Sequence, residues 1–437
     1  MKRVTALGFD FILLAAALLL LAFGILFIYS SGVSVVGGRS STGEFLKQLA
    51  WAGSGLLLLV GVILVNHARL RDLSVYLYGL MILLLLLTRF VGREVHGARS
   101  WLGIGEFGIQ PSEFAKITTI LMLAVYLTGI GKGIRELPRF LLGLAIVLLP
   151  VGLILLQPDM GTALVYFPIF LFMSFAAGAR MRHLAYLLAA GLGMVVLAVL
   201  PHYSLWLLGR EAGLLAALTG FGLARYILAA LAVVTALSAW GYWGFKRRYF
   251  YWIFYAVSLV FVCLTGAMLI NRVLKPYQIM RFIVFLDPQV DPQGAGWNLL
   301  QSVTAVGSGG FAGKGFLKGT QSHYQFLPQQ STDFIFSILA EEWGFLGGLL
   351  VFALFLVILL RGIRIMYIAR DDYGMYVAAG VVGMIFFHVV INVGMAMGIM
   401  PITGIPLFFL SYGGSSLWTA LIGVGLLLDI YFRRYGH

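Results

Sequence analysis

Apolar segments of about twenty residues alternate with short polar connections along most of this 437-residue chain. Twenty residues is the length an α-helix needs to cross the hydrocarbon core of a bilayer, and a helix satisfies its own backbone hydrogen bonds in lipid. No segment has the alternating pattern of a barrel strand. The pattern predicts an all-α polytopic membrane protein with about twelve transmembrane helices, at 10–29, 45–65, 73–90, 111–128, 140–157, 160–178, 184–202, 226–245, 250–270, 333–360, 373–398 and 416–432.

The first apolar segment follows Met1-Lys2-Arg3 and resembles a signal peptide. It has no small-residue cleavage site and many spans follow it, so we interpret it as the first membrane helix. Lys and Arg in short loops mark the cytoplasmic side. With both termini cytoplasmic, seven basic clusters fall on that side: Lys2-Arg3, Arg69/Arg71, Lys132/Arg135/Arg139, Arg180/Arg182, Lys246-Arg247-Arg248, Arg361/Arg364/Arg370 and Arg433-Arg434.

Composition narrows the class of protein and its possible partners further. The chain is 61% hydrophobic and only 11% charged, which excludes a soluble globule. Its net charge is +13, and the basic clusters lie on one side of the membrane in the predicted orientation. We therefore expect membrane lipids around it and no nucleic acid partner. The single cysteine, Cys263, excludes an intramolecular disulfide and is interpreted as a small core residue. No P-loop, paired-glycine nucleotide motif or zinc spacing is present, so no nucleotide is expected.

We treat residues 1–437 as one membrane domain with two distinctive parts. Residues 203–270 are rich in Ala, Leu and Tyr, have few polar groups, and predict an inserted helical hairpin. The chain from Asn271 to about Asp333 is the one long polar interruption, and with this orientation it is extracytoplasmic. A loop of that length is usually functional or disordered. Because 271–332 mixes glycine turns with aromatic and acidic residues, we predict an ordered catalytic loop.

Ionisable side chains inside spans point to function by default, because lipid makes them costly. In Q110PSEFAK116, Pro111 suits the first helical turn, and Ser112 and Glu113 suit the positive helix start. Glu113 and Lys116 are three residues apart and share a face. Either they form a local ion pair, or Lys116 faces a cavity and meets an anionic group; both can hold together.

Two further segments interrupt the spans. In Q157PDMGT162, Asp159 either caps the next helix or lies on non-helical backbone beside a wet cavity. In P401ITGIPLFFLSYGGSS416, the glycines and serines either make tight turns or present N–H groups to a phosphate. His388 and Asn392, four apart, favour interhelical hydrogen bonding over ligand binding. Glu113, Lys116, Asp159 and the 401–416 segment all lie at the outer half of the predicted bundle. Polar groups placed there suit an anionic lipid-linked substrate.

Seven motifs, in order, resemble the SEDS family (shape, elongation, division and sporulation) of polytopic glycosyltransferases. They are W101LGIGEFGIQPSEFAKI117, Q157PDMGTA163, D291PQGAGWNLLQS302, G307SGGFAGKG315, F326LPQQSTDFIF336, A340EEWGFLGG348 and P401ITGIPLFFLSYGGSS416. G319TQSHYQFLP328 resembles the RodA, or elongation, branch. The family core usually has ten spans, so 203–270 would be an insertion. The chain departs from the family at Gly296-Trp297-Asn298, and Gln329 and Ser331 exclude a required carboxylate or histidine there.

The resemblance implies a peptidoglycan glycosyltransferase that polymerises lipid II, with undecaprenyl pyrophosphate as leaving group. It implies Asp291 as the base for the acceptor hydroxyl, whereas Asp287 caps a turn. Lys116 is expected to bind the pyrophosphate, with Glu113 orienting it. Arg281 and Lys314 either assist or are solvated charges. Further substrate-site residues carried over are Ser112, Trp101, Gln157, Asp159, Thr162, Asp333 and Ser411.

A divalent cation (Mg or Mn) bridging a carboxylate and pyrophosphate is compatible with this chemistry, although no residue pattern requires one. The resemblance also implies a class B penicillin-binding protein, the elongation transpeptidase, as partner. Two rival functions remain: a lipid II flippase and a non-catalytic scaffold of a cell-wall synthesis complex. Against a transporter, polar groups crowd one side and no inverted repeat is evident.

Overall fold

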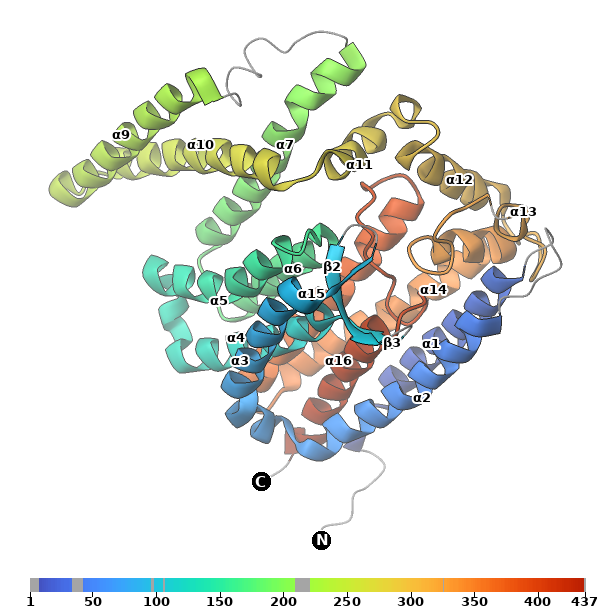
Figure 1. Ribbon diagram of the computed structural model, residues 1–437. Helices are drawn as coiled ribbons and strands as arrows, with labels where there is room; N and C mark the ends of the chain where they lie inside the picture. The colour runs from blue at the N-terminus through green and yellow to red at the C-terminus, as the bar shows by residue number, and fades with distance from the viewer. Residues whose placement is uncertain are drawn as a thin grey trace. The chain divides into compact units, whose positions relative to one another are not determined.

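The computed structural model describes residues 8–33, 42–95, 98–104, 107–208, 221–324 and 326–435. The chain forms two compact units: Met1–Ala179 with Asn298–His437, and Arg180–Trp297 (Figure 1). The helices of segment 203–270 lie in the second unit. The long loop 271–332 is divided between the two units at residue 297.

Each predicted span contains a helix. Eleven helices in the described residues are long and apolar enough to cross a membrane, and α6 is an apolar helix of 17 residues. The predicted helical membrane bundle is therefore confirmed. The helices are α1(Phe11–Gly32), α2(Thr42–Val65), α3(His67–Val91), α4(Pro111–Ile130), α5(Leu137–Leu155), α6(Met160–Ala176), α7(Met181–Leu208), α9(Phe221–Phe245), α10(Arg248–Val273), α11(Pro276–Leu286), α12(Ala295–Ser308), α13(Thr320–His323), α14(Ile335–Ile368), α15(Asp372–Ala396) and α16(Gly414–Phe432), with 3-10 turns at Gly131–Arg135, Pro288–Val290 and Arg433–Tyr435.

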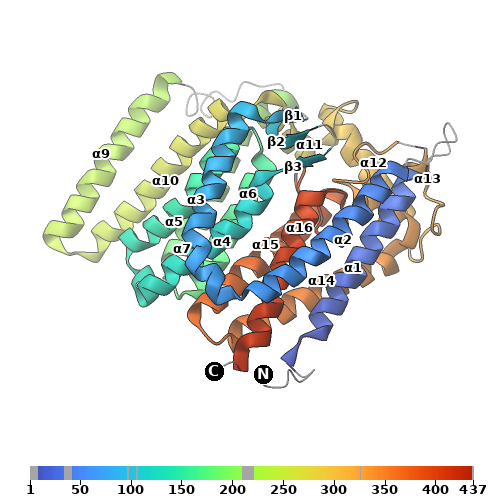
Figure 2. The ribbon, with the colours of Figure 1, turned by 60° about the horizontal axis from the view of Figure 1, so that its bottom comes forward.

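In the first unit, α15 and α16 are the most buried helices. Helix α15 packs against α4, α6 and α14, and α16 packs against α2 and α4 (Figure 2). The start of α1 and the end of α16 lie together, since Arg434 Nη1 donates to the Gly8 carbonyl at 3.4 Å. Gly24 lets α1 approach the 401–411 segment: a Cβ there would lie 2.1 Å from the Phe409 carbonyl oxygen.

A small antiparallel sheet between α3 and α4 was not part of the all-helical prediction. Its strands are β1(Arg93–Val95), β2(Ala98–Ile104) and β3(Phe107–Ile109), in the order β1-β2-β3. Arg93 pairs with Trp101, and Leu102 pairs with Ile109. These strands lead directly into α4, whose first residue is Pro111.

Helix α14 is broken at Gly344, whose φ of 63° lies in the left-handed region. Loop residues 310–315 replace the missing helical hydrogen bonds. The amides of Lys314 and Gly315 donate to the carbonyls of residues 341 and 342, at 3.0 and 2.9 Å. The amides of residues 345 and 346 donate to the carbonyls of residues 310 and 311, at 2.9 and 3.2 Å. Part of the long loop is thus built into the helix.

In the second unit, α10 packs against both α7 and α9. Tyr186 of α7 packs on Tyr255 of α10, with ring centroids 5.2 Å apart. Further along, a Cβ at Gly193 would lie 2.5 Å from Cys263 Sγ. Cys263 is buried, which confirms its prediction as a small core residue.

Candidate active site

The start of α4 holds a buried ion pair. Lys116 is fully buried, and its Nζ donates to Glu113 Oε1 at 2.7 Å. This confirms the predicted local pair. Because the ammonium is enclosed, a ligand reaches it only after side chains move. The Ser112 hydroxyl and Glu113 Oε2 are also buried and have no hydrogen-bond partner in the part of the chain that the structure describes.

His388 of α15 completes this cluster. Its Nδ1 lies 2.8 Å from the Pro406 carbonyl oxygen, and its Nε2 lies 3.1 Å from Lys116 Nζ. A carbonyl only accepts, so Nδ1 carries the proton and Nε2 accepts from the ammonium. The imidazole also stacks on Phe408, with centroids 3.6 Å apart. His388 therefore connects the ion pair to the 401–411 segment, a contact that the sequence analysis missed.

Asp159 caps α6, as one of its two predicted roles required. Its Oδ1 accepts from the Thr162 amide at 3.1 Å, and its Oδ2 accepts from the Thr162 hydroxyl at 2.9 Å. Oδ2 also accepts from Gln110 Nε2 at 2.8 Å, which joins this cap to the residue preceding α4. Gln157 is fully buried and donates to the Leu85 carbonyl, while its Oε1 has no described partner.

The 401–416 segment holds the end of the long loop. Ser411 is buried, and its hydroxyl donates to the Thr332 carbonyl at 2.6 Å. Asn392 donates to the carbonyls of Asp333 and Ile405, at 2.9 and 2.8 Å. The Ser411 hydroxyl is thus used within the protein, and Asp333 is fixed through its backbone. Asn392 thus bonds to backbone carbonyls, whereas His388 bonds to the Pro406 carbonyl and to Lys116 of α4, which is the interhelical hydrogen bonding that its position predicted.

Trp101 lies on β2 and covers Gly108 of β3. A Cβ at Gly108 would lie 2.9 Å from the Trp101 ring, so glycine allows the close approach of the indole. The indole remains partly exposed. Trp101 thus lies on the hairpin that leads into α4, and its role at the substrate site stays a prediction.

Lys314 belongs to a polar cluster that the sequence analysis did not select. Its Nζ donates to Glu341 Oε1 at 2.8 Å and to Thr320 Oγ1 at 2.7 Å. Glu341 is fully buried, and its Oε1 also accepts from the amides of Thr320 and Gln321, at 2.7 and 3.0 Å. Lys314 is therefore a partner of a buried carboxylate, not a solvated charge. The sequence did carry a signal for this cluster, because A340EEWG344 holds two adjacent carboxylates inside an apolar span.

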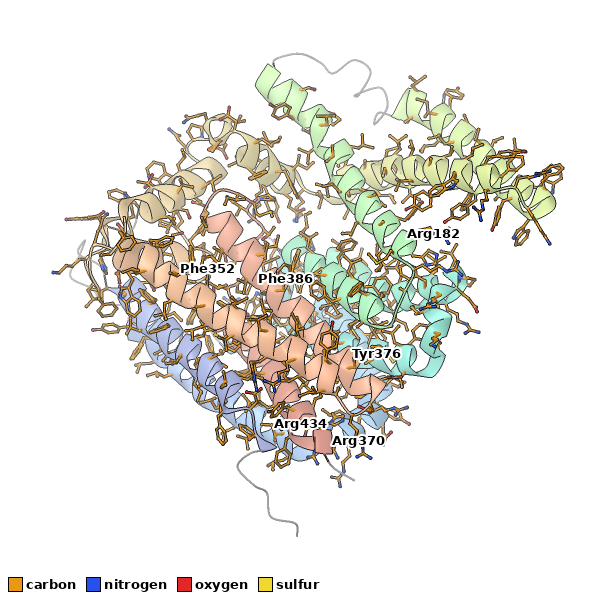
Figure 3. The ribbon with its side chains drawn as sticks, turned by 180° about the vertical axis from the view of Figure 1, so that it is seen from behind. Arg182, Phe352, Arg370, Tyr376, Phe386 and Arg434 are labelled. Carbon is orange, nitrogen blue, oxygen red and sulfur yellow. The ribbon has the colours of Figure 1, made fainter. Side chains whose placement is uncertain are left out.

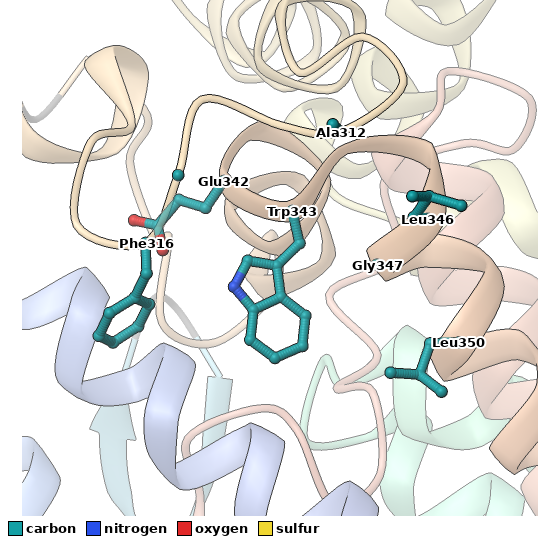
Figure 4. Close-up of a pocket in the computed structure, with 8 residues that line it drawn as sticks. Ala312, Phe316, Glu342, Trp343, Leu346, Gly347 and Leu350 are labelled. Carbon is teal, nitrogen blue, oxygen red and sulfur yellow. The ribbon is translucent and has the colours of Figure 1, made fainter.

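The neighbouring carboxylate, Glu342, is also fully buried. Its Oε1 accepts from the Ser30 hydroxyl and lies 3.2 Å from His323 Nε2. Figure 4 shows the adjoining pocket of about 380 Å³, where Glu342 meets the apolar side chains of Phe316 and Trp343. This pocket contains none of the predicted site residues.

In the second unit, the two prolyl-linked aspartates have different surroundings. Asp287 Oδ1 accepts from the Gln289 amide at 2.9 Å, which confirms its prediction as a turn cap. The carboxylate of Asp291, which is partly exposed, lies over Gly294: a Cβ there would be 2.2 Å from Oδ2. Arg281 lies in α11 with its guanidinium 5.7 Å from the Tyr277 ring centre.

The residues described by the structure contain no group of three or more His, Cys, Asp or Glu side chains suited to hold a metal ion. Buried carboxylates 113, 341 and 342 each contact a Lys or His side chain instead.

A family model for FtsW, RodA and SpoVE, described as cell cycle protein, matches residues 10–211 and 211–435. The peptidoglycan glycosyltransferase RodA of Treponema pallidum (strain Nichols) is 50% identical over 426 residues, covering 98% of both chains. The chain belongs to the SEDS family. This SEDS chain is also 35% identical over 432 residues to stage V sporulation protein E of Bacillus subtilis (strain 168), covering 98% of both.

Solved SEDS structures share the fold. The rod shape determining protein RodA of Thermus thermophilus is 27% identical, covers 99% of each chain, and superposes with a TM-score of 0.61. A chain from a structure of a peptidoglycan synthase complex is 29% identical, with a TM-score of 0.64 and coverage of 98% and 99%. The match to RodA over nearly the full length confirms the predicted family and its elongation branch.

Proposed function

We propose that this SEDS protein polymerises lipid II into glycan strands at the outer face of the cytoplasmic membrane during cell elongation. It is a peptidoglycan glycosyltransferase of the RodA type, as its 50% identity to such an enzyme over 98% of both chains indicates. That match is the observation that carries the assignment. The 30% identity to the peptidoglycan glycosyltransferase MrdB of Escherichia coli (strain K12) agrees with it.

Asp291 is the proposed general base. A sugar hydroxyl is a weak nucleophile near neutral pH, so a carboxylate that takes its proton during attack on the donor C1 lowers the barrier. The C1–oxygen bond to undecaprenyl pyrophosphate then breaks, and attack from the opposite face converts the α-linked donor to a β-linkage. The partial exposure of Asp291 supports this role, whereas Asp287 is used as a turn cap.

The leaving group needs positive charge or hydrogen-bond donors. Lys116 remains our candidate for this role, with Glu113 orienting it through their 2.7 Å contact. Ser112 Oγ, Glu113 Oε2 and Gln157 Oε1 have no hydrogen-bond partner among the described residues, which favours a neighbour rich in donors, such as water or substrate hydroxyls. Trp101, Asp159, Thr162, Asp333 and Ser411 support the shape of this region, and Arg281 is a further candidate for phosphate contact.

We place both termini in the cytoplasm and residues 271–332 outside. The contact between Gly8 and Arg434 supports a common side for the two ends. A class B penicillin-binding protein is the proposed partner, because a chain of similar fold occurs in a peptidoglycan synthase complex. A divalent cation, Mg or Mn, is part of the proposal; when bound, it would supply positive charge for the leaving pyrophosphate.

Incubation of the purified protein with labelled lipid II in detergent tests the proposal. Flipping has no meaning without a bilayer, so glycan chains in this assay would come only from polymerisation. A flippase or a scaffold would leave lipid II unchanged, even with the cognate penicillin-binding protein added. If glycan chains form only when the penicillin-binding protein is present, they would still be assigned to this protein, provided that a catalytically inactive variant of the partner also allowed their formation.

A further inference from the structure

One end of the second unit is strongly basic. The start of α7 and the turn between α9 and α10 lie together there, since the Arg182 guanidinium lies 5.1 Å from the Tyr251 ring centre. Tyr255 also donates to the Arg182 carbonyl at 3.1 Å. We call this end the basic tip; its cations are Arg180, Arg182, Lys246, Arg247 and Arg248. Figure 3 shows Arg182 on α7.

Among the residues of this unit that the structure describes, no carboxylate forms an ion pair with the basic tip. Residues 212–286 contain no Asp or Glu. The acidic residues described in this unit, Asp287 and Asp291, follow α11 and lie beyond the other end of α10. Basic clusters of the first unit differ, because they contain internal ion pairs: Arg361 with Asp10, Arg433 with Asp429, and Arg139 with Glu136.

Large aromatic side chains surround the same end. Trp240, Trp243 and Trp252 are 70%, 84% and 57% exposed. Tryptophan and tyrosine gather at the level of lipid headgroups, where one edge of the ring is apolar and the other is wet. Phe245 and Phe250 stack beside the turn, with centroids 5.9 Å apart. The cations thus lie where helices of membrane-spanning length end in an aromatic belt.

We propose that the basic tip binds the phosphate headgroups of anionic phospholipids at the membrane surface where these helices end. A cluster of four to eight cations beside a membrane helix has this preference, and each cation near the surface raises affinity by roughly fivefold. The absence of carboxylates in 212–286 leaves this charge available. Loop cations that only set the orientation of a protein in the membrane need neither so many charges at one place nor exposed tryptophans beside them.

Native mass spectrometry of the full-length protein, with phosphatidylglycerol or phosphatidylcholine added to the detergent, tests the proposal. The variant K246Q/R247Q/R248Q removes three cations of the basic tip. The matched control, K132Q/R364Q/R370Q, removes three exposed cations from the first unit. We expect the wild type and the control to prefer phosphatidylglycerol, and the tip variant to lose at least about tenfold of that preference. A second variant, R182Q, should lose part of it.

Two outcomes of the lipid comparison would overturn the proposal. One is equal retention of the two lipids by the wild type, and the other is an equal loss of preference in the tip and control variants. Inorganic phosphate added at the lipid concentration should not displace phosphatidylglycerol, and full displacement would show a free-phosphate site instead. Equal melting temperatures of all variants would exclude unfolding as the cause of a loss. Polymerisation of lipid II is a separate measurement, so neither result depends on the other.

Discussion

Replacement of Lys116 by Met should destabilise the protein strongly. Both members of the Glu113–Lys116 pair are buried, with side chains 3% and 0% exposed, and 2.7 Å separates Oε1 from Nζ. Removing one partner of a buried pair leaves an uncompensated charge and costs about 3–5 kcal/mol. Here it also leaves His388 Nε2 without its described donor. We therefore expect the free energy of unfolding, measured by reversible denaturation in mixed micelles, to fall by about this amount.

The chain offers a matched control with the same spacing. Glu136 and Arg139 also form an i,i+3 pair, at 3.4 Å, but their side chains are 60% and 49% exposed. Arg139→Met should cost no more than about 1 kcal/mol, because exposed pairs contribute little. The double variant E113Q/K116M removes both charges and should recover much of the stability lost in K116M.

The same variants separate the two roles of Lys116. If it binds pyrophosphate, the double variant should be folded yet defective in polymerisation of lipid II. Equal stability of K116M and R139M would refute the buried-pair argument. A double variant with wild-type turnover would reduce Lys116 to a structural residue.

Three other changes test particular contacts. Glu341→Gln should cost about 1–3 kcal/mol and increase amide hydrogen exchange at 314–322, because it weakens the charged bonds that fix this loop; unchanged exchange would contradict that anchor. Gly294→Ala should lower turnover with little change in melting temperature, since its Cβ would displace the Asp291 carboxylate. Unchanged turnover would show that catalysis does not require the Asp291 carboxylate at its position over Gly294. Asp159→Ala should cost about 1 kcal/mol through the lost cap of α6, whereas Asp159→Asn should retain it; equal thermal melts of both would exclude the cap.

Local chemistry made much of the fold predictable. Lipid requires long apolar helices, so the pattern placed a helix at each predicted span. Pro111 marks the first residue of α4 because proline suits the first helical turn. Asp159 and Asp287 act as caps because their side chains reach amides two or three residues ahead. These features depend on neighbours in the sequence.

Features set by distant contacts were not predicted. Helix α14 reads as one apolar run, and its break at Gly344 depends on insertion of loop 310–315. The strands around Trp101 are too short, at three to seven residues, for a clear alternating pattern. His388 reaches Lys116 only because α15 packs against α4. Glu341 and Glu342 are different: the cost of charges in a span, applied to Lys116, should have selected them too.

The central claim is that Asp291 acts as the base in glycan polymerisation. Its most direct test is the rate of lipid II polymerisation by purified, folded D291N beside D287N, which makes the same chemical change four residues away. We expect D291N to form no detectable glycan and D287N to keep much of the wild-type rate, because asparagine can still cap the turn. Equal rates for wild type and D291N would remove Asp291 from the base role.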